Sequence, residues 1–431
     1  MQQTQQPVSE SDGVTRRRFL RAAAASTAMA TGVKISRAAA GANETLGIGF
    51  IGVGGRGASH IHTVRGLIKA GEKAKIVAVC DAYGPRMKQH AEKNQAKAYK
   101  KHGDLLADKD VDVVCISSPD RLHLPQAIDA VRAGKDVYCE KPMGHWSQIT
   151  EAKLFRDETL KHRRVVQVGT QGTSSAIWGE VGELIRKGAI GQPRHVQAGY
   201  YRNGDWGERM RIPDPNAKPG PELDWQAFLG DAPKVPFSVE RFFSWRMFLD
   251  YSGGPSTDLL PHVFTPFVYM LRLGCPSLAV ASGGIFQYTG YGREVPDTFN
   301  MCLDYPEKLS VVLVCTLAND YNTGPCIRGD EGALTFEVAG WEAGCQNVQI
   351  QPQRRGKGSG KKIQKVELKT KRIGSTAEHW RDFLRGVRTR QQPRSNVEFG
   401  YRVHVALAMA MQALLKQKVA RFDAKKEEVL F

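Results

Sequence analysis

Apolar runs alternate with amphipathic stretches through the first part of the chain. Residues 46–51 form a short apolar run of the kind that makes a buried parallel strand, and a helical spacing of apolar residues follows over about residues 58–70. Further apolar runs at residues 75–80, 111–117, 136–139 and 165–168 alternate with helical patterns at 125–133 and 149–162. This alternation predicts a doubly wound parallel sheet.

The pattern changes after about residue 195. Residues 195–250 are rich in Trp, Tyr, Arg, Pro and Gly, a composition typical of loops around a polar ligand. Four β-type runs between residues 278 and 350 are separated by turn residues and predict a largely antiparallel sheet, and residues 376–388 and 400–420 have helical spacing. We therefore predict an α/β protein with a leader and linker (1–42), a nucleotide-binding domain (43–165), and a substrate domain (166–431) with an open, mainly antiparallel sheet and returning C-terminal helices.

A glycine motif directly follows the first predicted strand. Gly52 permits a tight turn, Gly54 allows a pyrophosphate to approach the backbone, and Gly57 allows close packing of helix on strand. The second predicted strand ends in Asp81, where a carboxylate accepts the ribose hydroxyls and repels a 2′-phosphate. A lone glycine motif is weak, but with its strand, helix and acid it predicts a Rossmann domain that binds NAD in preference to NADP.

Charge is concentrated in two segments. The formal net charge is +17, of which residues 1–40 supply +4 and residues 354–372, with nine bases and one acid, supply +8. The second segment surrounds a Gly-Lys-Gly-Ser-Gly run and predicts an exposed hairpin, either a solvated loop or a contact for an anionic surface. No aromatic residues interleave with its bases, so we expect no nucleic-acid partner.

The N-terminus resembles an export signal. Residues 15–21 (TRRRFLR) form a twin-arginine motif, a mildly apolar stretch follows over residues 22–33, and Ala38, Ala39 and Ala40 supply a small-residue cleavage site. The apolar stretches at 22–33 and 403–415 are too short to span a bilayer. We therefore expect a protein exported by the twin-arginine route, periplasmic or otherwise outside the cytoplasm, without a stable membrane span.

Cysteine usage gives no sign of metal chemistry. The eight cysteines contain no CxxC pair and no metal-ligand spacing, so we expect no metal site. Most of them lie in apolar strand-like runs and are best understood as small buried hydrophobic residues.

The chain resembles the glucose–fructose oxidoreductase / inositol dehydrogenase (Gfo/Idh/MocA) family. The matching segments are the GIGFIGVGGRG opening, Asp81, SSPDRLH (117–123), CEKP (139–142), GGPSTDLLPH (253–262), and residues 224–254, which resemble exported bacterial members. The resemblance implies a Rossmann domain joined to an α/β domain with an open sheet. It also implies an oxidoreductase that uses a nicotinamide cofactor on a secondary alcohol of a sugar or cyclitol, and a homo-oligomer formed through the C-terminal sheet.

The same resemblance suggests roles for individual residues. Lys141 matches the family's Glu-Lys-Pro lysine, and Asp258 and His262 match its Asp-x-x-x-His pair; either Lys141 or His262 is the base. The expected cofactor-binding residues are Gly52, Gly54, Gly55, Arg56, Gly57, Asp81, Ser118, Pro119, His123, Glu140 and Lys141. Gln171, Tyr200, Arg202, Trp206, Trp245 and Arg246 are candidate substrate contacts, with core packing or loop anchoring as the alternative for each of them.

The Asp258–His262 spacing carries a structural expectation. An i,i+4 pair lies on one face of a helix, and Asp258 would then orient the His262 imidazole. If Thr257 caps that helix, Pro261 falls in its first turn, where it is tolerated. The chain departs from the usual family pattern at Leu260, where many members have Gly, and at Thr265, where many have Asp.

Export bears on how the cofactor is used. Because no NAD pool exists outside the cytoplasm, an exported enzyme must carry its cofactor tightly bound and regenerate it in place. This favours redox-neutral turnover: oxidation of one sugar with reduction of another, or transient oxidation that permits epimerisation or glycosidic cleavage. A noncatalytic sugar-binding protein on the same fold is the alternative, because fold does not dictate function.

Overall fold

The first sheet is parallel throughout. The computed structural model describes residues 44–204, 211–290, 292–340, 344–362, 364–366 and 375–431, so the predicted leader, Trp206 and part of the basic segment lie outside the described residues. In this part of the chain the first sheet has the strand order β3-β2-β1-β4-β5-β6, with every pair parallel. Its strands are β1 (Leu46–Ile51), β2 (Ala74–Cys80), β3 (Lys97–Tyr99), β4 (Val113–Ile116), β5 (Asp136–Glu140) and β6 (Val166–Gly169).

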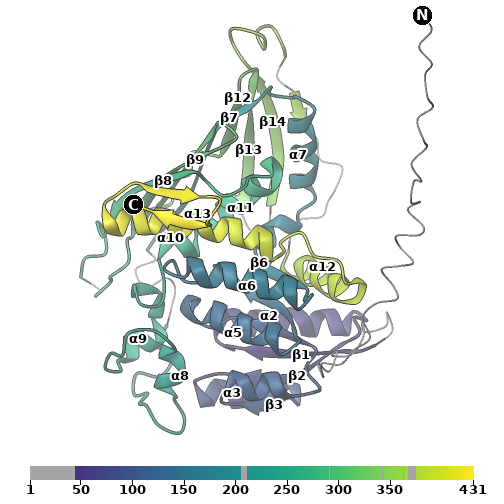
Figure 1. Cartoon of the computed structure of the whole chain (residues 1–431), viewed down its shortest axis with the longest axis vertical. Helices are drawn as coiled ribbons and strands as arrows, with labels where there is room; N and C mark the ends of the chain where they lie inside the picture. The colour runs from purple at the N-terminus through teal and green to yellow at the C-terminus, as the bar shows by residue number, and fades with distance from the viewer. Residues whose placement is uncertain (1–43, 205–210, 291, 341–343, 363, 367–374) are drawn as a thin grey trace, which may run out of the picture. The chain divides into compact units, whose positions relative to one another are not determined.

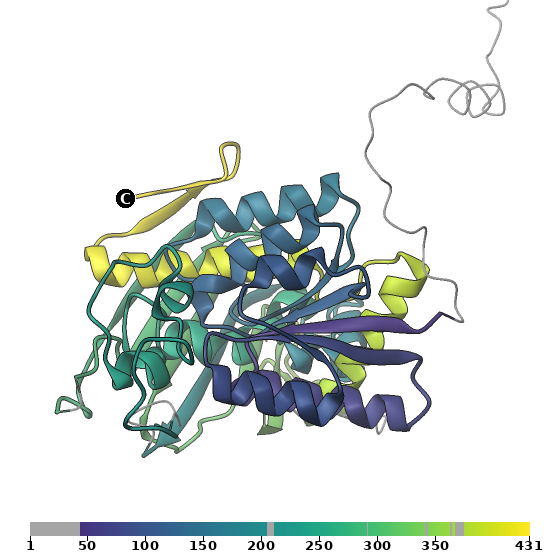
Figure 2. The ribbon, with the colours of Figure 1, turned by 90° about the horizontal axis from the view of Figure 1, so that it is seen from below.

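Helices cover both faces of this sheet, as a doubly wound fold requires (Figure 2). They are α2 (Gly55–Lys69), α3 (Gly84–Asn94), α4 (His102–Ala107), α5 (Asp120–Arg132) and α6 (Ile149–Lys161). Neither α3 nor α4 was assigned from the sequence, and α5 begins five residues before the predicted helix, so that Pro125 lies inside it. Pro125 has no N–H to offer the carbonyl of Arg121, and that carbonyl accepts a hydrogen bond from Gln148 Nε2 at 3.0 Å instead.

The second sheet is mixed but mostly antiparallel. Within the described residues it has 11 strands, in the order β15-β14-β13-β12-β7-β10-β9-β8-β16-β17, with β11 paired to β7. The predicted antiparallel sheet is confirmed, with one parallel pair, β7 with β10, in its interior. The strands are β7 (Pro193–Asn203), β8 (Leu278–Gly284), β9 (Thr298–Tyr305), β10 (Leu309–Thr316), β11 (Ala318–Asn319), β12 (Cys326–Gly329), β13 (Gly332–Gly340), β14 (Gly344–Pro352), β15 (Gln364–Val366), β16 (Ala420–Asp423) and β17 (Glu428–Leu430).

Two features of this sheet bear on the sequence predictions. β14 and β15 pair in an antiparallel manner, so the basic Gly-rich segment between them closes a hairpin as expected. Strand β10 alternates between buried and half-buried residues, as expected for a sheet with one face against the core. Oligomerisation through this sheet stays a prediction.

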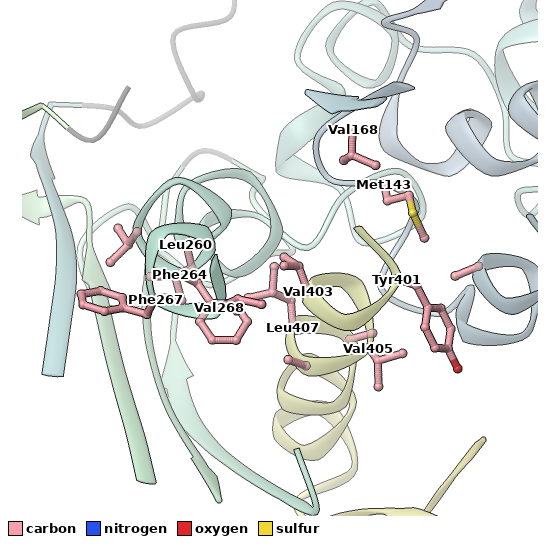
Figure 3. Packing of buried hydrophobic residues seen from close by; sticks show 14 of the residues in the cluster. Met143, Val168, Leu260, Phe264, Phe267, Val268, Tyr401, Val403, Val405 and Leu407 are labelled. Atoms are coloured by element: carbon pink, nitrogen blue, oxygen red, sulfur yellow. The ribbon is translucent and has the colours of Figure 1, made fainter. Parts of the chain in front are cut away.

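The remaining helices follow β6 along the chain (Figure 1). They are η1 (Gln171–Ser174), α7 (Ile177–Arg186), α8 (Trp225–Leu229), α9 (Val239–Phe243), η2 (Trp245–Met247), α10 (Pro255–Asp258), α11 (Leu260–Leu271), α12 (Thr376–Thr389) and α13 (Val397–Lys416). Side chains of α11 and α13 pack with Met143 and Val168 of the first domain in one hydrophobic cluster (Figure 3). Helix α12 packs on the first sheet, where Trp380 stacks on Tyr138 with ring centroids 4.7 Å apart. In the described residues, no helix has both the length and the apolar character needed to cross a bilayer.

Candidate active site

The glycine loop lies where strand order reverses, between the carboxyl ends of β1 and β4. Gly52 has a φ of 79°, and a Cβ there would lie 2.6 Å from the amide nitrogen of Ser118. A Cβ at Gly57 would lie 2.0 Å from the carbonyl oxygen of Gly52, so α2 can approach β1 this closely only with glycine at that position. By contrast, a Cβ at Gly55 would meet nothing within 4 Å, which leaves the loop backbone open on its outer side. The loop therefore has the shape that a pyrophosphate requires at a helix N-terminus.

A cavity of about 1110 Å³ extends from this loop along the carboxyl ends of the strands. One wall is formed by Gly52, Gly54, Asp81, Ser118 and Pro119, and the opposite wall by residues from the segment 211–246. A volume of this size at the topological switch point suits an extended dinucleotide.

Asp81 is held in place by three nitrogens at the end of β2. The backbone N–H groups of Val53 and Tyr83 donate to Oδ2 and Oδ1, each at 2.8 Å. Arg86 Nη2 lies 2.8 Å from Oδ1 and neutralises part of the carboxylate charge. The repulsion of a 2′-phosphate expected from Asp81 is therefore weakened by Arg86, a residue that the sequence analysis did not single out.

The segment 211–251 forms the second wall of the cavity around its own aromatic cluster. Short helices α8 and α9 begin at side-chain caps, where Asp224 accepts from the N–H of Ala227 and Ser238 from that of Arg241. Backbone hydrogen bonds fix the segment to the loop after β2: Gly84 N–H donates to the carbonyl of Glu222 at 2.8 Å, and Asp224 N–H to that of Ala82 at 2.9 Å. The sequence predicted only ligand-facing loops here, whereas the structure has a packed subdomain that contains Trp225, Phe228, Phe242, Phe243 and Tyr251.

Glu140, at the end of β5, is a buried carboxylate with several donors. Its Oε1 lies 2.9 Å from Arg56 Nε, 2.8 Å from His60 Nε2 and 3.3 Å from Gln171 Nε2. Trp380 Nε1 donates to His60 Nδ1 at 2.9 Å, so the neutral imidazole carries its proton on Nε2 and donates it to Glu140. Burial alone would raise the pKa of Glu140, but Arg56 and His60 hold it well below its usual value. Gln171, predicted to contact substrate, is buried and binds Glu140 instead.

A second cavity, of about 500 Å³, adjoins the first. The two share Gly55, Arg56, Ser117, Ser118 and Arg246, so a ligand bound in the first can extend into the second. The charged and titratable residues on its walls include Asp120, Lys141, Arg202, Arg246, Asp258 and His262.

Lys141 and Asp258 form a buried ion pair across this cavity. Lys141 Nζ donates to Asp258 Oδ1 at 2.7 Å and to its backbone carbonyl at 2.6 Å, with each side chain about a tenth exposed. Arg246 Nε lies 3.3 Å from the same Oδ1. Burial alone would raise the pKa of Asp258, but the two cations hold it well below its usual value.

His262 faces the same cavity from a separate helix. The expectation of a single helix capped by Thr257 is wrong: α10 ends at Asp258, and α11 begins at Leu260. The reason is Pro261, which cannot donate to the carbonyl of Thr257 and so interrupts the hydrogen-bond ladder, although it does lie in a first turn, that of α11. Burial and the Lys141 cation hold the pKa of His262 well below 6.5, so its imidazole is neutral.

His123 is buried between the turn after β4 and the turn after β5. Its Nδ1 lies 2.7 Å from the carbonyl of Pro142 and its Nε2 2.8 Å from that of Ser118. Burial lowers the pKa of His123, and the two carbonyls act in the opposite direction. The ring thus lies between the turn after β4 and the turn after β5 and can donate to one of the two carbonyls, and His123 also lines the second cavity.

Most of the residues predicted from the sequence line one or both cavities. Arg202 Nη2 donates to the Tyr200 hydroxyl at 3.2 Å, and the Tyr200 and His262 rings are 6.2 Å apart. Asp120, which lies between the predicted residues Pro119 and His123, is not among the residues predicted for the site; its signal in the sequence is an acidic residue in the SSPDRLH segment that follows the predicted strand. The predicted residues on the first cavity are Gly52, Gly54, Gly55, Arg56, Asp81, Ser118, Pro119, Trp245 and Arg246; those on the second are Gly55, Arg56, Ser118, His123, Glu140, Lys141, Arg202, Arg246, Asp258 and His262.

Comparison with known families identifies the first domain. Residues 46–170 match the model of the oxidoreductase family with an NAD-binding Rossmann fold (GFO_IDH_MocA). This range spans the parallel sheet and the glycine loop, so the match identifies an NAD-binding Rossmann fold in this part of the chain. The family resemblance and the cofactor predicted from the sequence are confirmed for this domain.

Individual relatives are similar over the same region. Inositol 2-dehydrogenase of Salmonella typhimurium (strain LT2) is 32% identical over 162 residues, which are 36% of this chain and 46% of that protein. A glycosyl hydrolase family 109 protein of Shewanella amazonensis is 31% identical over 227 residues, 45% of this chain and 47% of the relative. The chain thus spans about half the length of the relatives that it matches.

Solved structures extend the likeness of fold to almost the whole described chain. Aldose-aldose oxidoreductase from Caulobacter crescentus, complexed with glycerol, has a TM-score of 0.65 at 19% identity and covers 88% of this chain and 100% of its own. Levoglucosan dehydrogenase in complex with NADH and levoglucosan has a TM-score of 0.63 at 18% identity. The likeness covers 89% of this chain and 98% of the dehydrogenase chain. At these identities the likeness extends to the fold alone.

Proposed function

We propose that this protein is an exported NAD-dependent oxidoreductase that acts on a secondary alcohol of a sugar, glycoside or cyclitol and keeps its cofactor bound between turnovers. The observation that carries the proposal is the placement of Lys141, Asp258 and His262 on one cavity that adjoins the dinucleotide cavity. The names of the relatives, inositol 2-dehydrogenase and levoglucosan dehydrogenase among them, support a polyol substrate.

The residues of the first cavity fit NAD. The open backbone at Gly55 and the N-terminus of α2 would hold the pyrophosphate, and Asp81 would accept the adenosine ribose hydroxyls. NAD, when bound, supplies the hydride acceptor beside the second cavity.

His262 is the residue best placed to take the proton of the substrate hydroxyl. Loss of hydride from a carbinol carbon requires that its hydroxyl proton leave, so a base must stand on the same cavity. His262 is neutral because burial and Lys141 lower its pKa, whereas Lys141 already donates two short hydrogen bonds to Asp258. This favours His262 as the base of the two candidates.

Lys141 then stabilises the negative charge that develops on the substrate oxygen. Its ammonium group is fixed by the side chain and carbonyl of Asp258, so it need not reorganise when an alkoxide forms nearby. Asp258 acts through Lys141, by holding it in position and balancing its charge.

Retention of the cofactor is supported by the subdomain at 211–251. A cofactor in the first cavity would have the glycine loop on one side and the packed helices α8 and α9 on the other. This arrangement favours redox-neutral turnover, by oxidation of one sugar with reduction of a second. Transient oxidation within a glycosidase or epimerase is the second candidate, and the likeness to a glycosyl hydrolase family 109 protein favours it.

The proposal is tested with the full chain as purified. Denaturation of the protein should release NAD(H) in stoichiometric amount, and addition of inositol, glucose or levoglucosan in single turnover should produce the near-ultraviolet absorbance of the reduced nicotinamide. Protein that contains no NAD(H) and binds it only weakly would contradict retention. Binding of these sugars without any reduction of bound NAD would support the noncatalytic alternative.

Export is tested separately. Residues 1–42 fused to a folded reporter should carry it out of the cytoplasm, and replacement of Arg16 and Arg17 by Lys should abolish export. Unchanged export after this replacement would contradict the twin-arginine route.

A further inference from the structure

The second cavity contains a carboxyl group that the oxidation described above does not use. Asp120 is the first residue of α5, directly after the turn that follows β4, and it lines the cavity with Lys141 and His262. The residue is 1% exposed. The Ser252 hydroxyl hydrogen-bonds to the carboxyl group, but Oδ2 has no hydrogen-bond partner among the described residues.

A buried carboxyl oxygen without a partner is costly, and such atoms are uncommon in folded proteins. Two polar neighbours on the cavity wall have partners within the protein: Lys141 is bound to Asp258, and His123 contacts two backbone carbonyls. Asp120 thus adds a carboxyl oxygen with an unused acceptor to the wall of the cavity that Lys141 and His262 also line.

The charged groups that face Asp120 come from three separate elements. Arg246 from η2 and Lys141 after β5 favour its ionised form, while Asp258 from α10 opposes ionisation. Burial is the largest influence and raises the pKa of Asp120 to about 7. A carboxyl group with this pKa is present both as acid and as base near neutral pH, the condition under which proton transfer is most efficient.

We propose that Asp120 is a second acid–base residue of this site, which exchanges a proton with the carbon adjacent to the carbinol carbon once that carbinol has been oxidised to a ketone. This inference rests on the proposed function. It assigns to the cavity the removal of a proton from carbon. A simple dehydrogenase does not need this step, whereas epimerisation or elimination does.

The step is balanced within the site. Bound NAD would supply the hydride acceptor, and oxidation of the carbinol would pass its hydroxyl proton to His262 and leave a ketone. The Asp120 carboxylate then takes a proton from the neighbouring carbon, and the electrons of that C–H bond move to the ketone oxygen to form an enolate. The cations Lys141 and Arg246 stabilise the enolate oxygen. Return of the proton from Asp120 restores the ketone, and return of the hydride and of the His262 proton restores an alcohol, so no external oxidant is consumed.

The test uses the full chain with NAD bound, in deuterated water. Keto derivatives of methyl glucoside and of inositol are supplied directly, so that exchange at the neighbouring carbon does not depend on prior hydride transfer. Deuterium in the recovered sugar is followed by NMR. In the natural protein the exchange rate should rise with pH through about 7, as the carboxylate form of Asp120 accumulates.

Two variants isolate the role of Asp120. Asp120→Asn should lower the exchange rate by about two orders of magnitude or more, and by a clearly larger factor than it lowers single-turnover reduction of bound NAD by an alcohol substrate. The matched control is Asp129→Asn, because Asp129 lies on the same helix, is about half exposed and pairs with His102. This control should leave both rates unchanged.

Three results would overturn the inference: no exchange by the natural protein, exchange unaffected by Asp120→Asn, or equal loss of exchange and hydride transfer in a folded Asp120→Asn protein. The last result would make Asp120 a substrate-binding group. Failure of the proposed function has a different signature, since it would abolish reduction of bound NAD by alcohols without any bearing on exchange from a supplied ketone.

Discussion

Replacement of Asp120 by Asn should change how the stability of the protein depends on pH. The pKa of Asp120 is raised by burial from 3.8 to about 7 in the folded protein. Between these two values the folded state binds more protons than the unfolded state, so the free energy of unfolding falls as pH rises. Asn cannot ionise, and the Asp120→Asn protein should lose this part of the pH dependence.

The magnitude follows from the size of the pKa change. A rise from 3.8 to about 7 corresponds to about 4 kcal/mol of unfolding free energy, because each pKa unit is worth about 1.4 kcal/mol. Part of this loss has already occurred at about pH 5. From about pH 5 to about pH 8.5, the stability of the variant relative to the natural protein should therefore increase by about 3 kcal/mol.

Urea unfolding of cofactor-free protein, followed by tryptophan fluorescence across this pH range, measures the difference directly. Other titrating groups, including the buried histidines, are present in both proteins and cancel in the comparison. If the difference between Asp120→Asn and the natural protein stays flat with pH, Asp120 ionises alike in the folded and unfolded states; if it falls as pH rises, the folded state favours the ionised form. Either result would refute this reasoning.

Three further predictions concern catalysis, cofactor choice and the glycine loop. Lys141→Ala and His262→Ala should each lower single-turnover hydride transfer by about two orders of magnitude or more while NAD binding is kept, and full activity of both would remove the catalytic assignment. Asp81→Ala should weaken NAD binding by about tenfold or more and improve NADP binding, because Arg86 loses its carboxylate partner. Unchanged binding titrations of both cofactors would place the ribose elsewhere. Gly57→Ala should weaken NAD by at least about tenfold, since the new Cβ would lie 2.0 Å from the Gly52 carbonyl and α2 must move; retained affinity in calorimetry would show that the loop tolerates this shift.

The cofactor half of the molecule could be predicted from the sequence because its signals are local. A strand, a glycine turn, a helix and a second strand ending in Asp81 follow one another within about 35 residues, and each has its own pattern. Helices α3 and α4 were not assigned because their residues are mostly polar and their apolar faces are short. These helices are stabilised by contact with the sheet, which no local pattern records.

The substrate half depended on contacts between distant residues. The ion pair of Lys141 with Asp258 joins positions 117 residues apart, and the bond between Glu140 and Arg56 joins positions 84 apart. The sequence pattern predicts that Pro261 is tolerated in the first turn of one helix. In the structure its missing N–H interrupts the helix, and Asp258 and His262 lie on two separate elements. The subdomain at 211–251 escaped prediction because its helices are only five residues long and are defined by their caps and aromatic packing.

Two consecutive residues at the end of β5 connect the cofactor loop to the substrate helices. Glu140 is engaged by Arg56 of the glycine loop and by His60 of α2, and Lys141 is bound to Asp258 of α10. Glu140 is the last residue of β5 and Lys141 follows it directly, so one backbone segment serves both partners at once. Glu140 belongs to a buried strand that has β4 on one side and β6 on the other, and Lys141 is the next residue along the chain, so the distance between the two anchoring points is set by local backbone geometry. A dinucleotide positioned by the glycine loop and a sugar positioned at Lys141 would thus be held at a fixed separation, which is the main requirement for hydride transfer between them.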